Sequence, residues 1–309
     1  MSPDAHRSGV VDLDPKDPDA RRQVDELLSL VAEVSGHPAM GEPSLLAWRA
    51  GTEADDLVHR DGTVDGYARL ERHGTSVTVE VVVAPGRQEA RRALLSAGVA
   101  RASRPPTTEV RHWIYRHTPA DDDAPLSLGF HVERDLLQLR APLPLAVERP
   151  EVDRALVLRT FVPGTDEAAW LEVNNRAFAA HPEQGAWDLE TLRRREGAPW
   201  FDPDGFVLVE VDGRLAGSCW TKVHRDHEPV LGEIYVISVD PAFQGRGLGR
   251  ILAVAGLDWL TAHAEVGMLY VDRANDGALA LYDSLGFVVD HVDRCYLLEP
   301  GRPGGAAGG

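Results

Sequence analysis

The segment Gln244-Gly245-Arg246-Gly247-Leu248-Gly249 contains residue types that bind phosphate. An apolar stretch ending at Val239-Asp240-Pro241 precedes it, and apolar residues at helical spacing follow it, so we expect a strand, a glycine-rich turn and a helix. Glycines let the backbone approach an anion without an intervening Cβ, and a helix N-terminus adds partial positive charge. The segment therefore predicts a site where main-chain N–H groups bind a phosphate or diphosphate.

The spacing of these glycines excludes two common phosphate-binding motifs. A P-loop requires a Lys after its last glycine, and none follows here. A dinucleotide-binding fingerprint requires a third glycine at the position of Arg250. The pattern that remains, [RQ]-x-x-G-x-[GA] after a strand, resembles the acetyl-CoA pyrophosphate loop of the GNAT N-acetyltransferase superfamily.

A second segment supports this resemblance. It runs from Asn275 to Tyr282 and continues into Ser284-Leu285-Gly286-Phe287. In GNAT proteins, the pattern N-x-x-A-x-x-x-Y followed by G-F forms the helix and strand that close the other side of the coenzyme. The resemblance implies acetyl-CoA as co-substrate and no metal. It implies that the coenzyme is bound by Ile237, Ser238 and Val239, by Gln244, Gly245, Arg246, Gly247, Leu248, Gly249 and Arg250, and by Asn275, Asp276, Gly277, Ala278, Leu279 and Ala280.

Acetyl transfer to an amine also needs a base for the amine and an acid for the departing thiolate. We predict Glu233 as the base, because it lies four residues before Ile237 on one expected strand. A period of two places Glu233, Tyr235 and Ile237 on one face, and about 13 Å of strand separates Glu233 from Ile237, so a water is expected to relay the proton. The alternative is an ordinary solvated carboxylate. We predict Tyr282 as the acid, with a merely packed tyrosine as the alternative.

Two other sets of residues invite different chemistry. Cys219 and Cys295 suggest a covalent acyl-enzyme, but neither has a visible His–Asp partner, so we expect buried thiols and direct attack within a ternary complex. His224 and His227 suggest a metal pair. They flank an expected loop, and we predict no metal site there.

The elements that position these residues are expected to occur twice. In the first half, a strand-like run that ends in Pro, Val81-Val82-Val83-Ala84-Pro85, is followed by Ser127-Leu128-Gly129-Phe130. In the second half, the run Val236–Pro241 is followed by Ser284–Phe287 at almost the same interval. Such self-similarity predicts two copies of one domain. We therefore expect domains at 1–140 and 156–300, a Pro-rich linker at 141–155 and a disordered tail at 301–309.

Within the second copy the expected elements alternate. Strands are predicted at 156–160, 206–211, 215–223, 231–239, 268–271 and 295–298, and helices at 166–179, 189–196, 247–263 and 275–285. Asp212-Gly213 predicts a hairpin turn between two of these strands. The order indicates an α/β fold of the α+β type, a mixed sheet with helices on both faces, present as two tandem GNAT acyltransferase domains.

The first copy differs at the glycine turn. It reads Pro85-Gly86-Arg87-Gln88-Glu89-Ala90-Arg91-Arg92, without G-x-G and with an acidic residue where an anion should bind. We predict that this copy binds CoA weakly or not at all. The alternative is that Arg87, Arg91 and Arg92 restore binding by direct charge pairing.

Composition narrows the functional classes. The 309 residues are enough for two domains, and 43% hydrophobic content supports two cores. A net charge of −17 argues against nucleic acid, which is bound by clustered basic residues. No apolar run approaches the ~20 residues of a membrane span, and the first ten residues lack a signal-peptide core. With only two cysteines, we expect a cytoplasmic, monomeric protein without membrane or nucleic-acid partners.

Further motifs narrow the resemblance. They are 173–178 followed by His181-Pro182-Glu183-Gln184-Gly185, the segments 200–205 and 220–224, and Gly232-Glu233-Ile234-Tyr235-Val236. With the tandem layout, the chain resembles the mycothiol synthase family of actinobacterial GNAT enzymes, which acetylate the cysteinyl amine of desacetylmycothiol (Cys-GlcN-Ins) with acetyl-CoA. The resemblance implies that the acceptor is bound by Glu42, Glu183, Lys222, Glu233 and Tyr270.

Two other functions fit the same sequence. One is a GNAT enzyme acting on another small amine or a peptide N-terminus. The other is a non-catalytic protein that senses acyl-CoA. Glu233 and Tyr282 favour catalysis, because binding alone needs neither. The sequence does not decide whether the first domain binds a second acetyl-CoA, nor whether Glu233 acts directly or through water.

Overall fold

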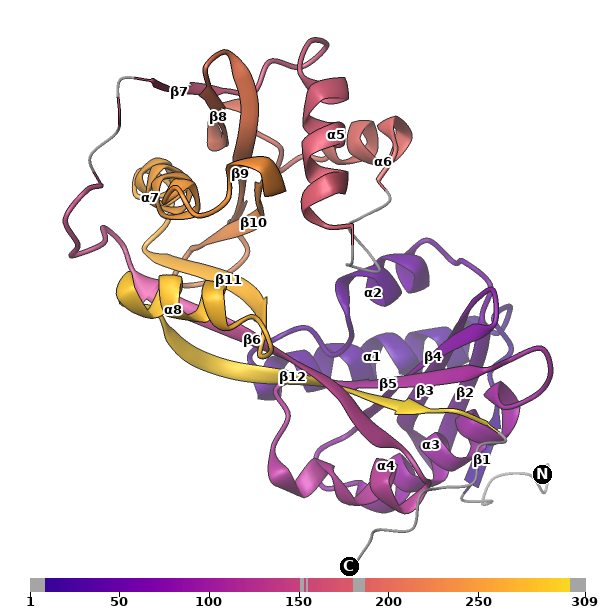
Figure 1. The fold of residues 1–309 in the computed structure, drawn as a ribbon. Helices are drawn as coiled ribbons and strands as arrows, with labels where there is room; N and C mark the ends of the chain where they lie inside the picture. Colours follow the sequence, from indigo (N-terminus) through magenta and orange to yellow (C-terminus); the bar gives the residue numbers. More distant parts are fainter. Residues whose placement is uncertain (1–8, 151–152, 154, 180–186, 301–309) are drawn as a thin grey trace, which may run out of the picture. The chain divides into compact units, whose positions relative to one another are not determined.

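The computed structural model describes residues 9–150, 153, 155–179 and 187–300. It divides the chain into two compact units, each of which is described separately (Figure 1). Unit 1 comprises Met1–Leu136 and Val292–Gly309, and unit 2 comprises Leu137–His291. In the part of the chain that is described, no helix has both the length and the apolar character needed to cross a bilayer.

Unit 1 is a mixed sheet with helices packed against it. Its strand order is β1-β2-β3-β4-β5-β12, antiparallel except for the parallel β4–β5 pair. Two apolar clusters of buried residues form its core. Its elements are β1 (Gly9–Asp12), α1 (Pro18–Ser35), α2 (Glu42–Arg49), β2 (Asp55–Asp61), β3 (Thr63–His73), β4 (Ser76–Val83), α3 (Gln88–Ala102), β5 (Glu109–Ile114), η1 (Pro119–Asp121), α4 (Asp123–Ser127), and parts of β6 (His131–Pro142) and β12 (Val288–Leu298).

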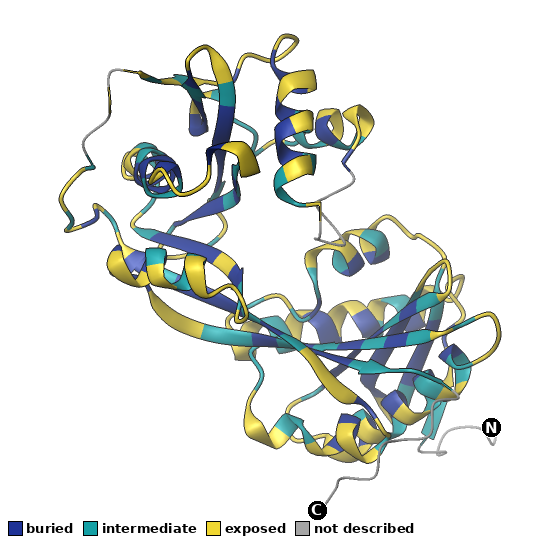
Figure 2. Cartoon of the chain, viewed as in Figure 1, coloured by how far each residue is buried: buried dark blue, intermediate teal, exposed yellow. Residues whose placement is uncertain are grey.

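Unit 2 repeats this architecture. Its strand order is β6-β11-β10-β9-β8-β7, with β10–β11 parallel, and α5 and α7 pack on opposite faces of β9 and β10 (Figure 1). Figure 2 shows that β9 and the inner side of α7 are buried. Its elements are β7 (Leu156–Thr160), α5 (Glu167–Ala177), α6 (Leu189–Glu196), η2 (Pro203–Gly205), β8 (Phe206–Val211), β9 (Arg214–His224), β10 (Leu231–Val239), η3 (Pro241–Phe243), α7 (Leu248–Leu260), β11 (Val266–Asp272) and α8 (Asp276–Ser284).

The predicted internal repeat is confirmed in the backbone. Each copy has one parallel strand pair, joined by a helix, and then a glycine with a left-handed backbone in Ser-Leu-Gly-Phe. The φ angle is 87° at Gly129 and 85° at Gly286. The hairpin turn is confirmed as well, since Asp212 and Gly213 both have positive φ, as a two-residue turn of type I′ requires.

Two boundaries differ from the sequence prediction. The expected linker at 141–155 begins inside β6, because Ala141 and Pro142 continue that strand. Pro142 is the last residue of β6, a position where a missing N–H is tolerated. The strand expected at 295–298 is longer, and its residues from Val292 onward belong to unit 1, where they pair with β5.

Candidate active site

The glycine turn joins β10 to α7 in unit 2. Gly245 and Gly247 have φ of 77° and 76°, a backbone region that other residues enter only with strain. No atom lies within 4 Å of the Cβ that either glycine would carry, so the space above the turn is open. Among the described residues, no group accepts from the N–H of Leu248 or Gly249, and no side chain caps α7. The turn therefore presents unpaired N–H groups at a helix N-terminus, which suits a diphosphate.

The adjoining strands separate beside this turn. Parallel pairing of β10 with β11 runs from Leu231, opposite Val266, to Ile234, opposite Leu269, and stops there. From Val236 to Val239, β10 pairs only with β9 in the described chain. One backbone edge of Ile237–Val239 therefore has free N–H and C=O groups. Such an edge can bind the amide groups of an extended ligand and direct an N–H at its carbonyl.

One expectation about this strand is wrong. The register with β9 shifts between Ile234 and Val236, so Tyr235 is the extra residue of a β-bulge. Glu233 pairs with Lys222, whereas Ile237 pairs with Cys219, which packs on α7. Since Lys222 and Cys219 are three residues apart on a regular strand, they point to opposite faces. Ile237 therefore lies on the face opposite Glu233, because a one-residue shift reverses the alternation.

Glu233 is a buried carboxylate with one hydrogen bond to another side chain. Only 8% of the residue is exposed, and Oε2 accepts a hydrogen bond from Nε2 of His224 at 2.7 Å. Its other oxygen, Oε1, has no hydrogen-bond partner among the described residues. A carboxylate with one oxygen fixed and one free is positioned to accept a proton. Sequence analysis did not identify His224 as a partner, although its place at the end of β9, beside the strand of Glu233, was a usable signal.

Lys222 lies in an aromatic environment on the same face. Its Nζ is 5.2 Å from the ring centre of Trp200 and 5.7 Å from that of Tyr235, and only 7% of the residue is exposed. Both rings contact Trp220, at 5.8 and 5.5 Å between centres. Cation–π attraction and close ring packing hold the ammonium group in place. The structure makes Lys222 and Glu233 direct cross-strand partners, and their binding of the acceptor stays a prediction.

Tyr282 lies on α8, which follows β11. It is buried, and this burial raises the pKa of its phenol. Within the described chain its hydroxyl has no hydrogen-bond partner, while its ring packs on Phe287 at 5.7 Å. A phenol with a raised pKa keeps its proton at neutral pH, which an acid for the thiolate must do. Asn275 caps α8 by accepting from the N–H of Ala278 at 3.1 Å, which fixes the start of this helix.

Tyr270 is held by residues that sequence analysis did not identify. Nε2 of Gln138 donates to its hydroxyl at 2.8 Å, and Oε1 of Gln138 accepts from Nε of Arg140 at 2.7 Å. Gln138 is 4% exposed, whereas Tyr270 is 41% exposed. The arrangement presents an exposed phenol on a fixed support. No sequence motif marked Gln138, because it lies on β6, far from Tyr270 along the chain.

The resemblance implies two further residues that bind the acceptor. Glu183 falls outside the described residues. Glu42 is the first residue of α2 in unit 1, and its contribution to an acceptor site stays a prediction.

Both cysteine thiols are buried. Burial raises the pKa of Cys219 to about 12 and also raises that of Cys295, so both stay protonated, as expected of packed thiols.

His224 and His227 have ring centres 5.8 Å apart, and Asp226 lies close to both. Partial burial, with His224 and Arg140 nearby, lowers the pKa of His227.

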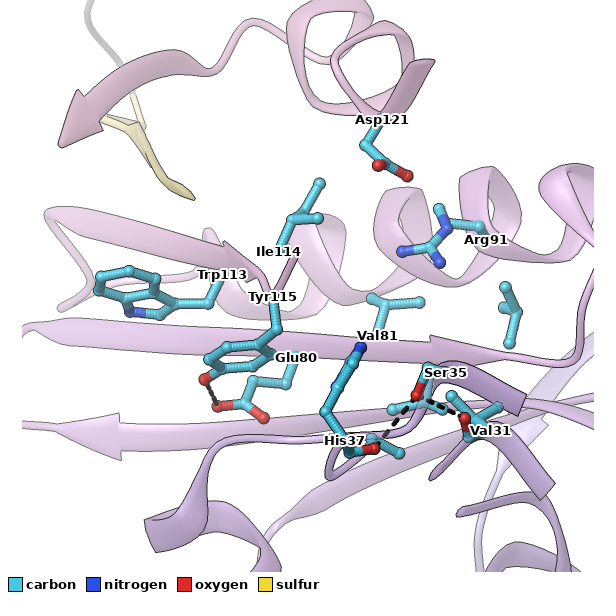
Figure 3. Close-up of a pocket in the computed structure, with 13 residues that line it drawn as sticks. Val31, Ser35, His37, Glu80, Val81, Arg91, Trp113, Ile114, Tyr115 and Asp121 are labelled. Carbon is cyan, nitrogen blue, oxygen red and sulfur yellow. Dashed lines mark hydrogen bonds between the residues drawn. The ribbon is translucent and has the colours of Figure 1, made fainter. Parts of the chain in front are cut away.

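Unit 1 has a cavity at the corresponding strand pair. It is about 180 Å³ in volume, and Figure 3 shows Glu80, Arg91, Tyr115 and Asp121 among its lining residues. Pockets that hold drug-sized ligands occupy about 300–1,000 Å³. Glu80 accepts from the Tyr115 hydroxyl at 2.9 Å, and burial raises the pKa of Glu80.

The helix start in unit 1 is less suited to an anion. Arg87 precedes α3 and forms ion pairs of 3.2 Å with both Asp61 and Asp65. Its charge is therefore already matched by carboxylates, and burial lowers the pKa of Arg91. These contacts favour the prediction that unit 1 binds CoA weakly over the alternative of rescue by arginines.

Comparison with known proteins identifies the class. The model of the acetyltransferase (GNAT) family matches residues 168–287. A GCN5-related N-acetyltransferase from Sphaerobacter thermophilus has a similar structure, with a TM-score of 0.72 at 23% identity over 98% of both chains. A tandem GNAT protein from the clavulanic acid biosynthesis pathway has a TM-score of 0.70 at 21% identity, over 96% of this chain and 100% of that one. The predicted tandem GNAT fold is confirmed.

Sequence relatives narrow the class to one family. A mycothiol acetyltransferase from Thermomonospora curvata is 45% identical over 90% of this chain and 94% of its own length. One from Acidimicrobium ferrooxidans is 50% identical over 75% of this chain and 78% of its own. The chain belongs to the mycothiol acetyltransferase family and is an acyltransferase, as the sequence motifs indicated.

Proposed function

We propose that this chain transfers the acetyl group of acetyl-CoA to the cysteinyl amine of desacetylmycothiol and so forms mycothiol. Family membership supports the substrate, because the relatives carry the name mycothiol acetyltransferase. The observation that carries the reaction is Glu233, a buried carboxylate with one free oxygen, on the same strand whose later residues, Ile237–Val239, form the open edge that leads to the glycine turn. A binding protein without catalysis would not need a carboxylate fixed in this way.

The residues present fit the coenzyme. The N–H groups at the start of α7 would bind its diphosphate, and the open backbone edge of Ile237–Val239 would bind the amides of its arm. When bound, acetyl-CoA supplies the acetyl group as a reactive thioester. An N–H of the same strand edge would donate to the thioester carbonyl, where negative charge develops during transfer.

Two side chains move protons in this proposal. Glu233 removes a proton from the acceptor ammonium, through a water where the amine does not reach it, because Oε1 is free of other hydrogen bonds. Tyr282 donates its proton to the departing thiolate, since burial keeps the phenol neutral. Both are general acid–base steps, which contribute about 10²–10⁴-fold each.

The acceptor-binding residues complete the proposal. Glu42, Glu183, Lys222, Glu233 and Tyr270 suit a cationic amine and a hydroxyl-rich sugar–inositol. Lys222 donates to hydroxyl groups, and the Tyr270 hydroxyl is held by Gln138 at 2.8 Å. Attack within a ternary complex is part of the proposal, because the raised pKa of Cys219 makes it a poor nucleophile. A Cys219→Ala variant should keep its rate within a few-fold.

The oligomeric state and the cellular location are also part of the proposal. We infer a cytoplasmic location, supported by two cysteines that are both free, and we keep the monomer as part of the proposal. The second copy alone carries the G-x-G turn, so we assign catalysis to unit 2 and no coenzyme binding to unit 1.

One experiment separates this function from its alternatives. The protein is mixed with acetyl-CoA and a panel of amines, and CoA thiol release is followed. Release with Cys-GlcN-Ins and not with simple amines or peptides supports the proposal. Equal release with generic amines would favour a different GNAT substrate. Tight CoA binding without any release would favour an acyl-CoA sensor.

A further inference from the structure

We propose that His224, Asp226 and His227 form a binding site for a divalent transition metal, with Zn²⁺ as the fitting ion, and that its occupancy inhibits acetyl transfer. One possible ligand atom from each side chain lies within 4.8 Å of the other two. His224 ends β9, and Asp226 and His227 follow it in the connection to β10. The sequence alone predicted no metal site here, because the two histidines flank an expected loop, and the closeness of the three side chains revises that prediction.

The donor set fits zinc. Two imidazole nitrogens and one carboxylate oxygen are common ligands of Zn²⁺, with a fourth position open to water. At bond lengths of about 2.1 Å, tetrahedral ligands lie about 3.4 Å apart, so ligand atoms that are within 4.8 Å of one another must close by at most about 1.4 Å. Asp226 is exposed and rotates freely, which makes such closure possible. Harder ions such as Mg²⁺ and Ca²⁺ prefer all-oxygen sites.

An independent observation points to the same site. Nε2 of His224 donates to Glu233 at 2.7 Å, and this bond leaves the lone pair of Nδ1 available. Histidines that bind metals usually donate their other ring N–H to a carboxylate, which fixes the ring and its tautomer. The Glu233–His224 pair already has this arrangement, which would leave Nδ1, on the far side of the imidazole ring, to bind the metal.

The local charges largely balance. Asp226 attracts a cation while Arg140 opposes it, and both lie near enough to His227 to affect its electrostatics. The site is therefore suited to reversible binding rather than to a permanent structural metal. This fits a regulatory site better than a catalytic one.

Inhibition would act through Glu233 and rests on the proposed function. A metal on Nδ1 draws electron density from the imidazole ring and strengthens the Nε2–H bond to the Glu233 carboxylate. The carboxylate is then held more rigidly against His224, which limits its movement toward the acceptor amine. The bound ion also fixes the loop that follows β9, beside the residues expected to bind the acceptor.

Binding is tested first, on the full chain freed of metal with a chelator. ZnCl₂ is titrated by calorimetry into the wild type, His227→Ala, Asp226→Asn and the control His73→Ala, an exposed histidine at the end of β3. We expect one Zn²⁺ per wild-type chain, at least a tenfold loss of affinity in His227→Ala and Asp226→Asn, and no change in His73→Ala. Equal affinity in all four proteins, or no binding by the wild type, would overturn the site.

Activity is tested separately. Zinc should lower the initial rate of the wild type several-fold, a chelator should restore it, and His227→Ala should keep its rate. Because CoA and the cysteinyl acceptor both bind zinc, wild type and variant are compared at the same total zinc. Equal inhibition of both would overturn the regulatory role. Zinc binding in a protein without acetyltransferase activity would instead contradict the proposed function and leave the site standing.

Discussion

The carboxylate of Glu233 and the imidazole of His224 lie 2.7 Å apart on adjacent strands, and His224 is two residues beyond Lys222, the direct cross-strand partner of Glu233. The bond fixes one carboxylate oxygen and leaves the other free. It connects the predicted base of the reaction to a loop outside the coenzyme groove. Both the chemistry of transfer and its proposed control by metal depend on this contact.

Replacing Glu233 tests the base. Glu233→Gln keeps the shape and the contact with His224 but removes the basic oxygen. We expect kcat to fall about 10²–10³-fold, the usual range for a lost general base. Acetyl-CoA affinity, measured by calorimetry, should change little, because the coenzyme groove is formed elsewhere on β10 and α7. Unchanged turnover would remove Glu233 from the role.

His224→Asn provides the matched control for this variant. A hydrogen bond to a charged group contributes about 1.5–3 kcal/mol, so we expect His224→Asn to lower kcat by at most roughly 10- to 100-fold. If His224 acts only by positioning Glu233, the double variant is no slower than Glu233→Gln alone. Multiplicative losses would show that His224 acts independently.

A pair of glycine variants tests the diphosphate site. Gly247→Ala and Gly213→Ala place a Cβ at φ angles of 76° and 74°, and neither Cβ has a neighbour within 4 Å. Both should therefore lose similar stability, about 1–2 kcal/mol, measured by urea unfolding. Only Gly247→Ala should weaken acetyl-CoA binding, because its Cβ enters the space above the turn. Equal coenzyme affinity in both variants would show that the turn does not bind the diphosphate.

The pH dependence of kcat tests Tyr282. Burial raises the pKa of its phenol above the ordinary value of about 10. The acid form is fully present below the raised pKa and is lost only as the pH passes it. We therefore expect no falling limb due to this group between about pH 8 and 10. Tyr282→Phe should lower kcat by about 10²-fold across this range. A limb near pH 10 that disappears in Tyr282→Phe would show an ordinary phenol.

Gln138→Leu tests the support of Tyr270. Its amide donates to the Tyr270 hydroxyl, so its loss should raise KM for the acceptor without raising KM for acetyl-CoA. Tyr270→Phe should have a similar effect, and the double variant should be no worse than either. An unchanged acceptor KM in Gln138→Leu, with stability intact by thermal unfolding, would show that Gln138 has no positioning role.

Much of the site followed from local patterns. The glycine turn, the hairpin at Asp212-Gly213 and the spans of β7, β8, β10 and α6 were predictable, because turn chemistry and short-range periodicity determine them. Glu233 was predicted as the base because it lies four residues before Ile237 on one expected strand. These signals lie within a few residues of the feature that they predict.

The rest depended on contacts that no local pattern records. The bulge at Tyr235 arises from pairing with β9, so the face of Ile237 was predicted wrongly. Gln138 and Tyr270 are separated by 132 positions along the chain. The length of β12 was underestimated because Asp290, Asp293 and Arg294 interrupt its apolar pattern, and partners elsewhere, such as Asp135 for Arg294, stabilise it.

Because β12 is the last strand to be synthesised, the sheet of unit 1 can be completed only after unit 2. Residues from Val292 onward cover β5 and bring Tyr296, fully buried, into the core of unit 1. During synthesis, nearly all of unit 1 therefore leaves the ribosome with the edge of β5 unpaired. Unit 2 is synthesised before β12 pairs with that edge. We expect a chain stopped after His291 to expose unit 1 to protease, while unit 2 stays resistant. The unit that is translated first would then be the one that matures last.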